Sequence, residues 1–146
     1  QIGFTEQRLG FAGVSRAFVM LIHAVGLKRA RELLLSGRMI SGKEAAEIGL
    51  VNKAVPPDKL EEEVEKTAQA MCLLPRDGIA IGKAITHLTY EQMGFTAGLV
   101  AGYIGHTLFT NVRWEADEYN FFKQRREKGT RDAFHGRDER YQDLTP

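Results

Sequence analysis

The residue best suited to acid–base chemistry near the start of the chain is Glu6. It follows a short apolar segment, residues 1–4, and precedes residues 9–13, which read LGFAG. Glycine exposes backbone and leaves room for a ligand beside the carboxylate. The spacing is equally compatible with an ordinary solvated carboxylate, which is the commoner role of glutamate. The candidate substrate contacts in this segment are Gly10, Ala12 and Gly13.

A second candidate region is the basic segment near the other end of the chain. Residues 125–140 are rich in arginine and include Phe134, which makes phosphate binding a hypothesis there. Acidic residues between positions 115 and 139 balance these arginines and favour a solvated, mixed-charge end. The same balance argues against a nucleic-acid partner, because opposing charges cancel the gain from counterion release.

Three glycines recur at intervals of four residues in the apolar segment 95–109 and just before it. Gly94, Gly98 and Gly102 therefore fall on one face of a helix, where a second backbone can approach closely. A membrane span is the alternative, but His106, the threonines and the lack of a basic flank disfavour it. We expect packing between helices or subunits, and no membrane partner.

The other nucleophile and ligand types have no matching partners in sequence. Cys72 lies on or beside the apolar face of its helix, which predicts a buried, inert thiol, and a single cysteine fits a reducing cytoplasm or organelle matrix. Ser15 and Ser41 lack the Gly-x-Ser-x-Gly turn of a nucleophile, and Ser41 with Glu44 instead matches a helix-capping box. No metal site is expected, because no metal-ligand spacing occurs among His23, His87, His106 and His135.

The elements that must position these residues belong to one globular unit. The 146 residues are 43% hydrophobic with a net charge of +1, which excludes a disordered tail, a fibre and a nucleic-acid binder that acts through bulk charge. Without an initiator Met or a leader pattern, the sequence is expected to begin within a longer protein. Alternating or apolar patterns predict strands at residues 1–4, with Glu6 at the strand end, and at 50–55. Helical spacing and caps predict helices over 14–23, 27–35, 41–48, 58–71 and 75–90, and a helical last third.

In this order the segments resemble the C-terminal half of the crotonase family, the enoyl-CoA hydratase/isomerase superfamily. Residues 1–10 are similar to the family's F-G-x-P-E-x-x-L-G, and residues 44–56 follow its A-x-x-x-G-L-V-x-x-V-x-P segment. Residues 24–26 and 29–41 fall between them in the expected order. The resemblance implies an α/β fold, the C-terminal part of a crotonase fold, with short strands followed by a helical oligomerisation region. Residues 1–74 would belong to the core and residues 75–146 to the helices that pack subunits.

The resemblance also implies a chemistry. Family members bind an acyl-CoA thioester and stabilise an enolate-like intermediate with two backbone N–H groups. Glu6 matches the family's catalytic glutamate, so we expect a general acid/base in an enoyl-CoA hydratase or isomerase, with coenzyme A as part of the substrate and no other cofactor. The second glutamate and the oxyanion donors would come from an N-terminal half outside this sequence. Alternatives are a hydrolase, decarboxylase or dehalogenase on the same scaffold, or a non-catalytic oligomerisation module.

Departures from the family pattern bear on the substrate. Residues 14–17 read VSRA where the family has a glycine-rich stretch, and Thr5 replaces the proline before the glutamate. We expect Ser15 or Arg16 to reach the acyl pocket, which favours a polar, branched or cyclic acyl group. The same resemblance implies that the chain forms a homotrimer or hexamer. The residues expected near the adenine-nucleotide end of CoA are Phe134, Arg137 and Arg140.

Overall fold

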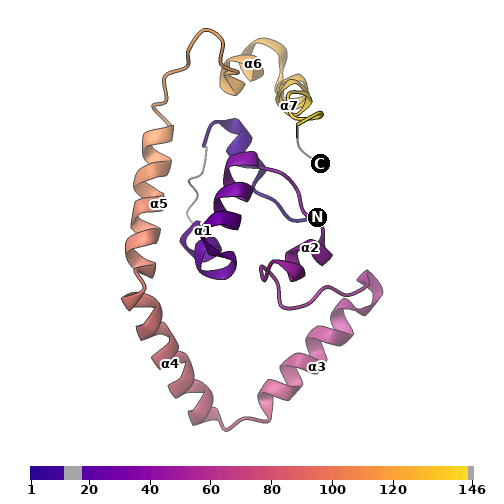
Figure 1. Ribbon diagram of the computed structural model, residues 1–146, viewed down its shortest axis with the longest axis vertical. Helices are drawn as coiled ribbons and strands as arrows, with labels where there is room; N and C mark the ends of the chain where they lie inside the picture. Colours follow the sequence, from indigo (N-terminus) through magenta and orange to yellow (C-terminus); the bar gives the residue numbers. More distant parts are fainter. Residues whose placement is uncertain (12–17, 145–146) are drawn as a thin grey trace.

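The computed structural model describes residues 1–11 and 18–144, and within these ranges the helices and their connections make up the fold, with no strand longer than a single bridged residue (Figure 1). In these described ranges, two short 3-10 helices, η1 and η2, accompany seven α-helices. In chain order the elements are η1 (Thr5–Leu9), α1 (Phe18–Ser36), α2 (Gly42–Glu47), η2 (Pro57–Lys59), α3 (Leu60–Cys72), α4 (Arg76–Gln92), α5 (Phe95–Phe109), α6 (Phe121–Lys128) and α7 (Thr130–Glu139).

The expected α/β fold with short strands is wrong for this chain. In the described part, the extended segments come together only at an isolated antiparallel bridge, where Ile2 and Ile40 exchange two backbone hydrogen bonds of 2.9 and 2.8 Å. One pair of residues without further neighbours makes no ladder, because a sheet needs several strands to be stable. Glu6 accordingly lies in a 3-10 helix and not at a strand end.

The second expected strand, residues 50–55, is also absent. The backbone N–H groups of Leu50 and Val51 both donate to the carbonyl oxygen of Ala45, at 2.8 and 3.2 Å. These donors therefore close the end of α2 and are not available to a strand partner. Leu50 and Val51 are both partly buried against the core, although they are consecutive and make no strand pairing.

A small core joins α1, α2 and the bridge. Its buried side chains come mainly from the second half of α1, with Ile40 and Ala45 completing it. Partly buried residues, including Ile2 and Phe4, pack against this cluster and hold the segment that leads into η1. The buried members are Leu21, Ala30, Leu33, Leu34, Ile40 and Ala45.

Two local predictions for α1 and α2 are confirmed. Gly26 interrupts α1 with φ 75° and ψ 162°, so the helix is kinked where the sequence predicts a break between two helices. At α2 the Ser41 hydroxyl accepts the backbone N–H of Glu44 at 3.1 Å, as the capping box predicts. The carboxylate of Glu44 does not complete the box by returning to Ser41, because it pairs with Arg38 at 2.6 Å.

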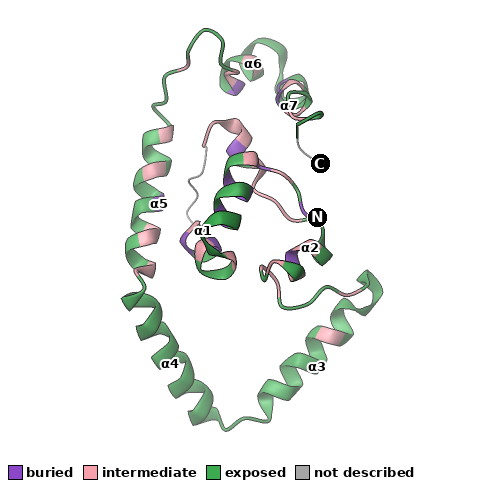
Figure 2. Ribbon diagram, viewed as in Figure 1, coloured by how far each residue is buried: buried purple, intermediate pink, exposed green. Residues whose placement is uncertain are grey.

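Helices α3, α4 and α5 form an outer frame around the α1–α2 unit (Figure 1). In α3 and α4, all of whose residues the structure describes, none is buried, and Figure 2 shows both helices as almost wholly exposed. Cys72 is exposed as well, so the prediction of a buried thiol is wrong: the apolar face of α3 is largely exposed, with Leu60, Val64 and Met71 at 56–59%. Glu62 and Lys66, one turn apart on α3, form an ion pair at 2.7 Å.

The frame returns to the core through α5. Gly98 lies against Val19 of α1 so closely that a Cβ atom would fall 2.5 Å from its Cγ2, and Gly102 is buried. Gly94 ends the connection before α5 in the left-handed region, with φ 81°. The predicted close packing at a glycine face is therefore confirmed at Gly98. Over the described ranges no helix combines the length and apolar character that a membrane crossing requires.

The chain ends in an α6–α7 hairpin. Phe121 is buried against Phe134, with ring centroids 4.9 Å apart. The hydroxyl of Tyr119 donates to the carbonyl oxygen of Ala133 at 2.8 Å and ties the segment before α6 to α7. Helix α7 packs in turn against η1, which places the end of the chain beside the turn that carries Glu6.

Candidate functional site: the turn that carries Glu6

Glu6 projects from a tight and well-defined turn. The N–H of Gln7 donates to the carbonyl oxygen of Phe4, and the N–H of Gly10 donates to that of Gln7, both at 3.1 Å. Gln7 is buried, whereas Glu6 is exposed. Gly10 ends the turn with φ 107°, a conformation that side-chain-bearing residues rarely adopt. The carboxylate is thus held on a fixed backbone and is open to a reactant.

Aromatic side chains cover the backbone that follows the turn. Trp114, in the connection between α5 and α6, lies so close to Gly10 that a Cβ there would be 2.5 Å from its ring. The ring of Phe11 stacks on that of His106 at 5.2 Å between centroids and meets Phe109 edge-on at 5.8 Å. The end of α5 and the connection after it therefore form one wall beside the Glu6 turn.

Of the predicted substrate contacts, only Gly10 falls within the described ranges. It lies four residues after Glu6, at the end of the same turn. Contact of Gly10 with an acyl group stays a prediction. The remaining predicted contacts lie outside the described residues and are Ala12, Gly13, Ser15 and Arg16.

Arg8 fixes the other side of the turn. Its Nε donates to the carbonyl oxygen of Ser36 at 3.1 Å, and its Nη1 lies 3.7 Å from Oδ1 of Asp138. The guanidinium also lies 4.2 Å from the ring centroid of Tyr141. Only 13% of the Arg8 side chain is exposed. One arginine therefore joins η1 to the end of α1 and to α7.

The predicted CoA-binding residues share α7 and its C-terminal end, but their surroundings differ. Arg137 is buried and makes two hydrogen bonds to Asp138, at 2.8 and 2.6 Å, with its guanidinium 4.8 Å from the ring centroid of Phe134. Phe134 is 40% exposed. Arg140 is exposed and lies 5.2 Å from the ring centroid of Tyr119. Arg137 already has a compensating carboxylate, so Phe134 and Arg140 are the members of this set that face solvent.

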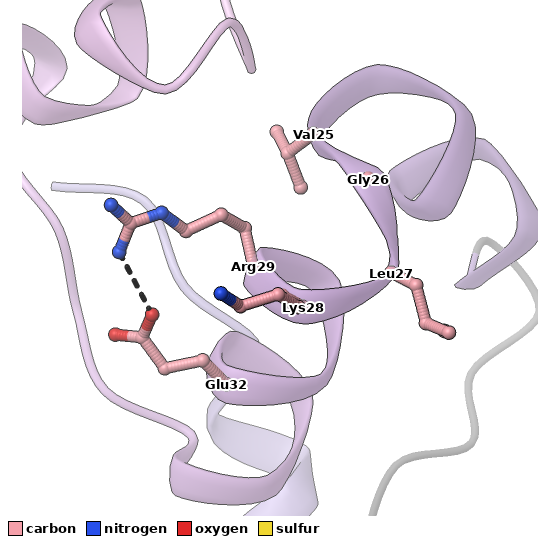
Figure 3. A pocket seen from close by; sticks show the side chains of 6 residues that line it. All are labelled: Val25, Gly26, Leu27, Lys28, Arg29 and Glu32. Carbon is pink, nitrogen blue, oxygen red and sulfur yellow. Dashed lines mark hydrogen bonds and ion pairs between the residues drawn. The ribbon is translucent and has the colours of Figure 1, made fainter.

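A pocket of about 720 Å³ opens at the kink of α1 (Figure 3). Figure 3 shows Lys28 and Arg29 at its wall, with Arg29 reaching Glu32 at 3.2 Å. Arg38 also donates a hydrogen bond to Glu32. The hydrogen bond from Arg38, and to a smaller extent that from Arg29, holds the pKa of Glu32 below its usual range. A carboxylate stabilised in its ionised form by two arginines is a poor general acid, so this pocket offers no acid–base pair.

A second pocket of about 720 Å³ lies between α1 and the α4–α5 junction. Its walls are mainly apolar, with His23 and His87 among them, and Glu91 at its edge is bound by the hydroxyl of Thr96 at 2.7 Å. Within the described ranges, no group of three or more His, Cys, Asp or Glu side chains is arranged to hold a metal ion. Neither pocket has Glu6 in its wall, and the acid–base role of Glu6 stays a prediction.

The sequence pattern did not indicate the residues that surround Glu6 in space. Trp114 and Asp138 are more than a hundred residues away along the chain, and no periodicity links them to the turn. The one local signal was Gly10, since a glycine at the end of a short turn marks a place where another group approaches closely. Arg8 lies two residues from Glu6, but its partners on α1 and α7 cannot be derived from spacing.

Comparison with known proteins relates this chain to one protein family. The sequence profile of the enoyl-CoA hydratase/isomerase family matches residues 1–123. A putative enoyl-CoA hydratase of Thermus thermophilus is 42% identical over 98 residues, which are 67% of this chain and 38% of that protein. Enoyl-CoA hydratase domain-containing protein 3, mitochondrial, of Rattus norvegicus is 40% identical over 83 residues, 57% of this chain and 28% of that protein.

Solved structures show the same likeness. An enoyl-CoA hydratase from Mycobacterium smegmatis matches with a TM-score of 0.75 and 26% identity, over 98% of this chain and 47% of that one. An enoyl-CoA hydratase/isomerase from Xanthobacter autotrophicus Py2 matches with a TM-score of 0.78 and 27% identity, over 94% of this chain and 50% of that one. The helical architecture is thus that of part of a crotonase-type protein. The chain belongs to the enoyl-CoA hydratase/isomerase family, and it spans half or less of the length of these relatives.

Proposed function

We propose that the full-length protein is an enoyl-CoA hydratase in which Glu6 acts as general acid/base. The observation that carries the proposal is the exposed carboxylate of Glu6 on a turn fixed by Gln7 and Gly10, inside the segment that matches the family. Relatives from Thermus thermophilus and Clostridioides difficile carry the name enoyl-CoA hydratase, which supports hydration over other reactions of the family.

The chemistry requires a proton to move as water adds across the double bond of an enoyl thioester. Oxygen bonds to the β-carbon, a proton is delivered to the α-carbon, and negative charge develops on the thioester oxygen. Glu6 would take or give the proton in this step, and its exposure on a rigid turn gives it access to water and substrate. The N–H groups that hold the thioester oxygen and the second glutamate are expected outside this sequence.

Two further outcomes share the same carboxylate. An isomerase would use Glu6 to shuttle a proton along the acyl chain, and a hydrolase or decarboxylase would divert the same enolate-like intermediate. Product analysis with an enoyl-CoA separates these reactions, because hydration alone gives a 3-hydroxyacyl-CoA. A polar, branched or cyclic acyl group remains our expectation for the substrate, and comparison of crotonyl-CoA with such thioesters tests it.

Coenzyme A is proposed to bind beside α7. Arg140 is exposed and carries a charge suited to a phosphate, and Phe134 is half-exposed and offers a ring to a nucleotide base. Arg137 is predicted to have a weaker direct role, since it is buried and bound to Asp138. The expected ligand is therefore the nucleotide end of the acyl-CoA substrate.

We also propose a homotrimer or a hexamer built on the outer frame. Large apolar side chains are exposed along α3, α4 and α5, among them Val64, Ile81, Ile85 and Ile104 at 57–64%. Exposed apolar surface on this scale marks an interaction site. A non-catalytic oligomerisation module would use the same surface, and binding of acyl-CoA by the full-length protein distinguishes the two.

The decisive experiment is Glu6→Gln in the full-length protein. Removal of a general acid/base should lower kcat by at least about 100-fold. The dissociation constant for acyl-CoA, measured by calorimetry, should change little because the amide keeps the size of the side chain. Glu47→Gln is the matched control, since Glu47 is an exposed glutamate on α2 whose nearest cation, Lys43, lies 4.0 Å away. Equal turnover in the two variants would refute the role of Glu6.

A further inference from the structure

The contacts of Arg8 connect the catalytic turn to two distant parts of the chain. Arg8 and Glu6 lie two residues apart on η1, a helix with three residues per turn. Viewed down the helix axis, their side chains therefore point in directions about 120° apart. Glu6 faces solvent, while Arg8 is 13% exposed and is directed at the end of α1 and at α7.

The structure around Arg8 is built to receive it. Gly37 follows α1 with φ 59°, and a Cβ at this position would lie 2.9 Å from Cγ of Arg8. The missing side chain leaves room for the arginine stem, and the guanidinium then reaches the carbonyl oxygen of Ser36. A guanidinium that is largely withdrawn from water needs compensation, and Asp138 with the ring of Tyr141 provides it.

Asp138 itself lies between two arginines. Its Oδ1 accepts a hydrogen bond from Nε of Arg137 and lies 3.7 Å from Nη1 of Arg8. Arg137 thereby fixes the carboxylate that faces Arg8. The turn that carries Glu6 is consequently held against α7 by a charge network whose other members lie more than 120 residues away along the chain.

We propose that Arg8 is a positioning residue: it holds η1 so that the Glu6 carboxylate keeps one orientation toward the substrate. This inference rests on the proposed function, because orientation affects rate only if Glu6 moves the proton. Misplacement of a reacting group by about 1 Å lowers rates by about 100-fold. Replacement of Arg8 should lower kcat and leave KM nearly unchanged, because Arg8 itself faces away from the substrate side of the turn.

The test compares Arg8→Met with Arg38→Met in the full-length protein. Both arginines have 13% exposed side chains and sit in ion pairs, but Arg38 binds Glu32 and Glu44, away from η1. Arg8→Met should lower kcat by about 10- to 100-fold with KM changed less than threefold. Arg38→Met should leave kcat within about twofold of the unmodified protein, even though it lowers stability.

Hydrogen exchange supplies a readout that does not depend on activity. In Arg8→Met, exchange should accelerate in a peptide covering residues 4–10, which contains the N–H groups of Gln7 and Gly10, more than it does in Arg38→Met. Arg8→Lys keeps the charge but not the planar guanidinium, so its exchange rate at residues 4–10 should lie between those of Arg8→Met and Arg38→Met. Asp138→Asn added to Arg8→Met should cause no further loss of kcat, because the two groups act as one unit.

The outcomes separate the two proposals. If the unmodified protein hydrates no enoyl-CoA but exchange at residues 4–10 still rises selectively in Arg8→Met, hydration is refuted and Arg8 is supported as the group that holds the turn. Exchange no faster than in Arg38→Met would overturn the holding role. Faster exchange with kcat equal to that of Arg38→Met would show that the held turn does not limit catalysis, and would overturn the positioning role.

Discussion

Replacement of Gly98 by alanine tests the packing that joins the outer frame to α1. A Cβ at position 98 would lie 2.5 Å from Cγ2 and 2.6 Å from Cβ of Val19. Favourable carbon contacts lie at 3.5–4.0 Å, so the two helices must separate by about 1 Å to accept the methyl group. Val19 is β-branched and stiff, and one of the two atoms is its own Cβ, so a change of rotamer does not relieve the clash.

The expected magnitude is a difference between two terms. Alanine is favoured over glycine inside a helix by about 1 kcal/mol, whereas overpacking a tight contact costs about 1–3 kcal/mol. Gly82 in α4 is the matched control, because it is also inside a helix and a Cβ there would meet nothing within 4 Å. Gly82→Ala should therefore raise the free energy of unfolding by about 1 kcal/mol. The free energy of unfolding of Gly98→Ala should be about 1–3 kcal/mol lower than that of Gly82→Ala.

Urea denaturation of both variants, followed by circular dichroism, measures this difference. The added change Val19→Ala removes the atoms that Gly98→Ala would strike, so the double variant should recover part of the loss. Equal stabilisation by Gly82→Ala and Gly98→Ala would refute the reasoning, because it would mean that α1 and α5 are not in close contact at this point.

Two further predictions concern α1 and α2. Ser41→Ala removes the cap of α2 and should lower the free energy of unfolding by about 1 kcal/mol, measured by urea denaturation, whereas Ser41→Gly should cost only a few tenths; equal losses would argue against the cap. Arg38 lowers the pKa of both Glu32 and Glu44, chiefly through hydrogen bonds, so its pairs stabilise the fold above the unfolded-state pKa of these carboxyls, near 4.5, and are lost as pH falls through the lower folded-state values. The stability difference between the unmodified protein and Arg38→Met should thus be larger at pH 7 than at pH 3, and a difference independent of pH would contradict it.

Local signals in the sequence predicted local structure well. Ser41 and Gly26 act through groups within a few residues, so the cap of α2 and the break in α1 follow from the sequence. The strand expected at residues 50–55 does not form, because its donors at Leu50 and Val51 close α2, and this competition is invisible in an alternating pattern. The prediction that Cys72 is buried was wrong. An apolar helix face indicates that some surface packs on it, but the sequence of the helix does not say whether that surface belongs to the same chain.

Of the candidate site, too, the sequence predicted the local part and not the tertiary contacts. Glu6 and Gly10 were identified from the sequence, through the type of residue and through the resemblance to the crotonase family. Its surroundings depend on tertiary contacts of long sequence separation, including Trp114 over Gly10 and Asp138 beside Arg8. No pattern within a segment encodes these, since each partner satisfies only its own local rules.

The exposure of α3 and α4 has a thermodynamic consequence. Without a buried residue, their stability within this chain rests on helix propensity and on pairs such as Glu62 with Lys66, each contributing about 0.2–0.5 kcal/mol. Local opening of the two helices is therefore cheap compared with opening of α1. Any surface that covers them binds the helical form and not the open one, so their helicity is linked to the concentration of that partner. The frame is then a concentration-dependent part of the fold, while the α1–α2 unit is an intrinsic one.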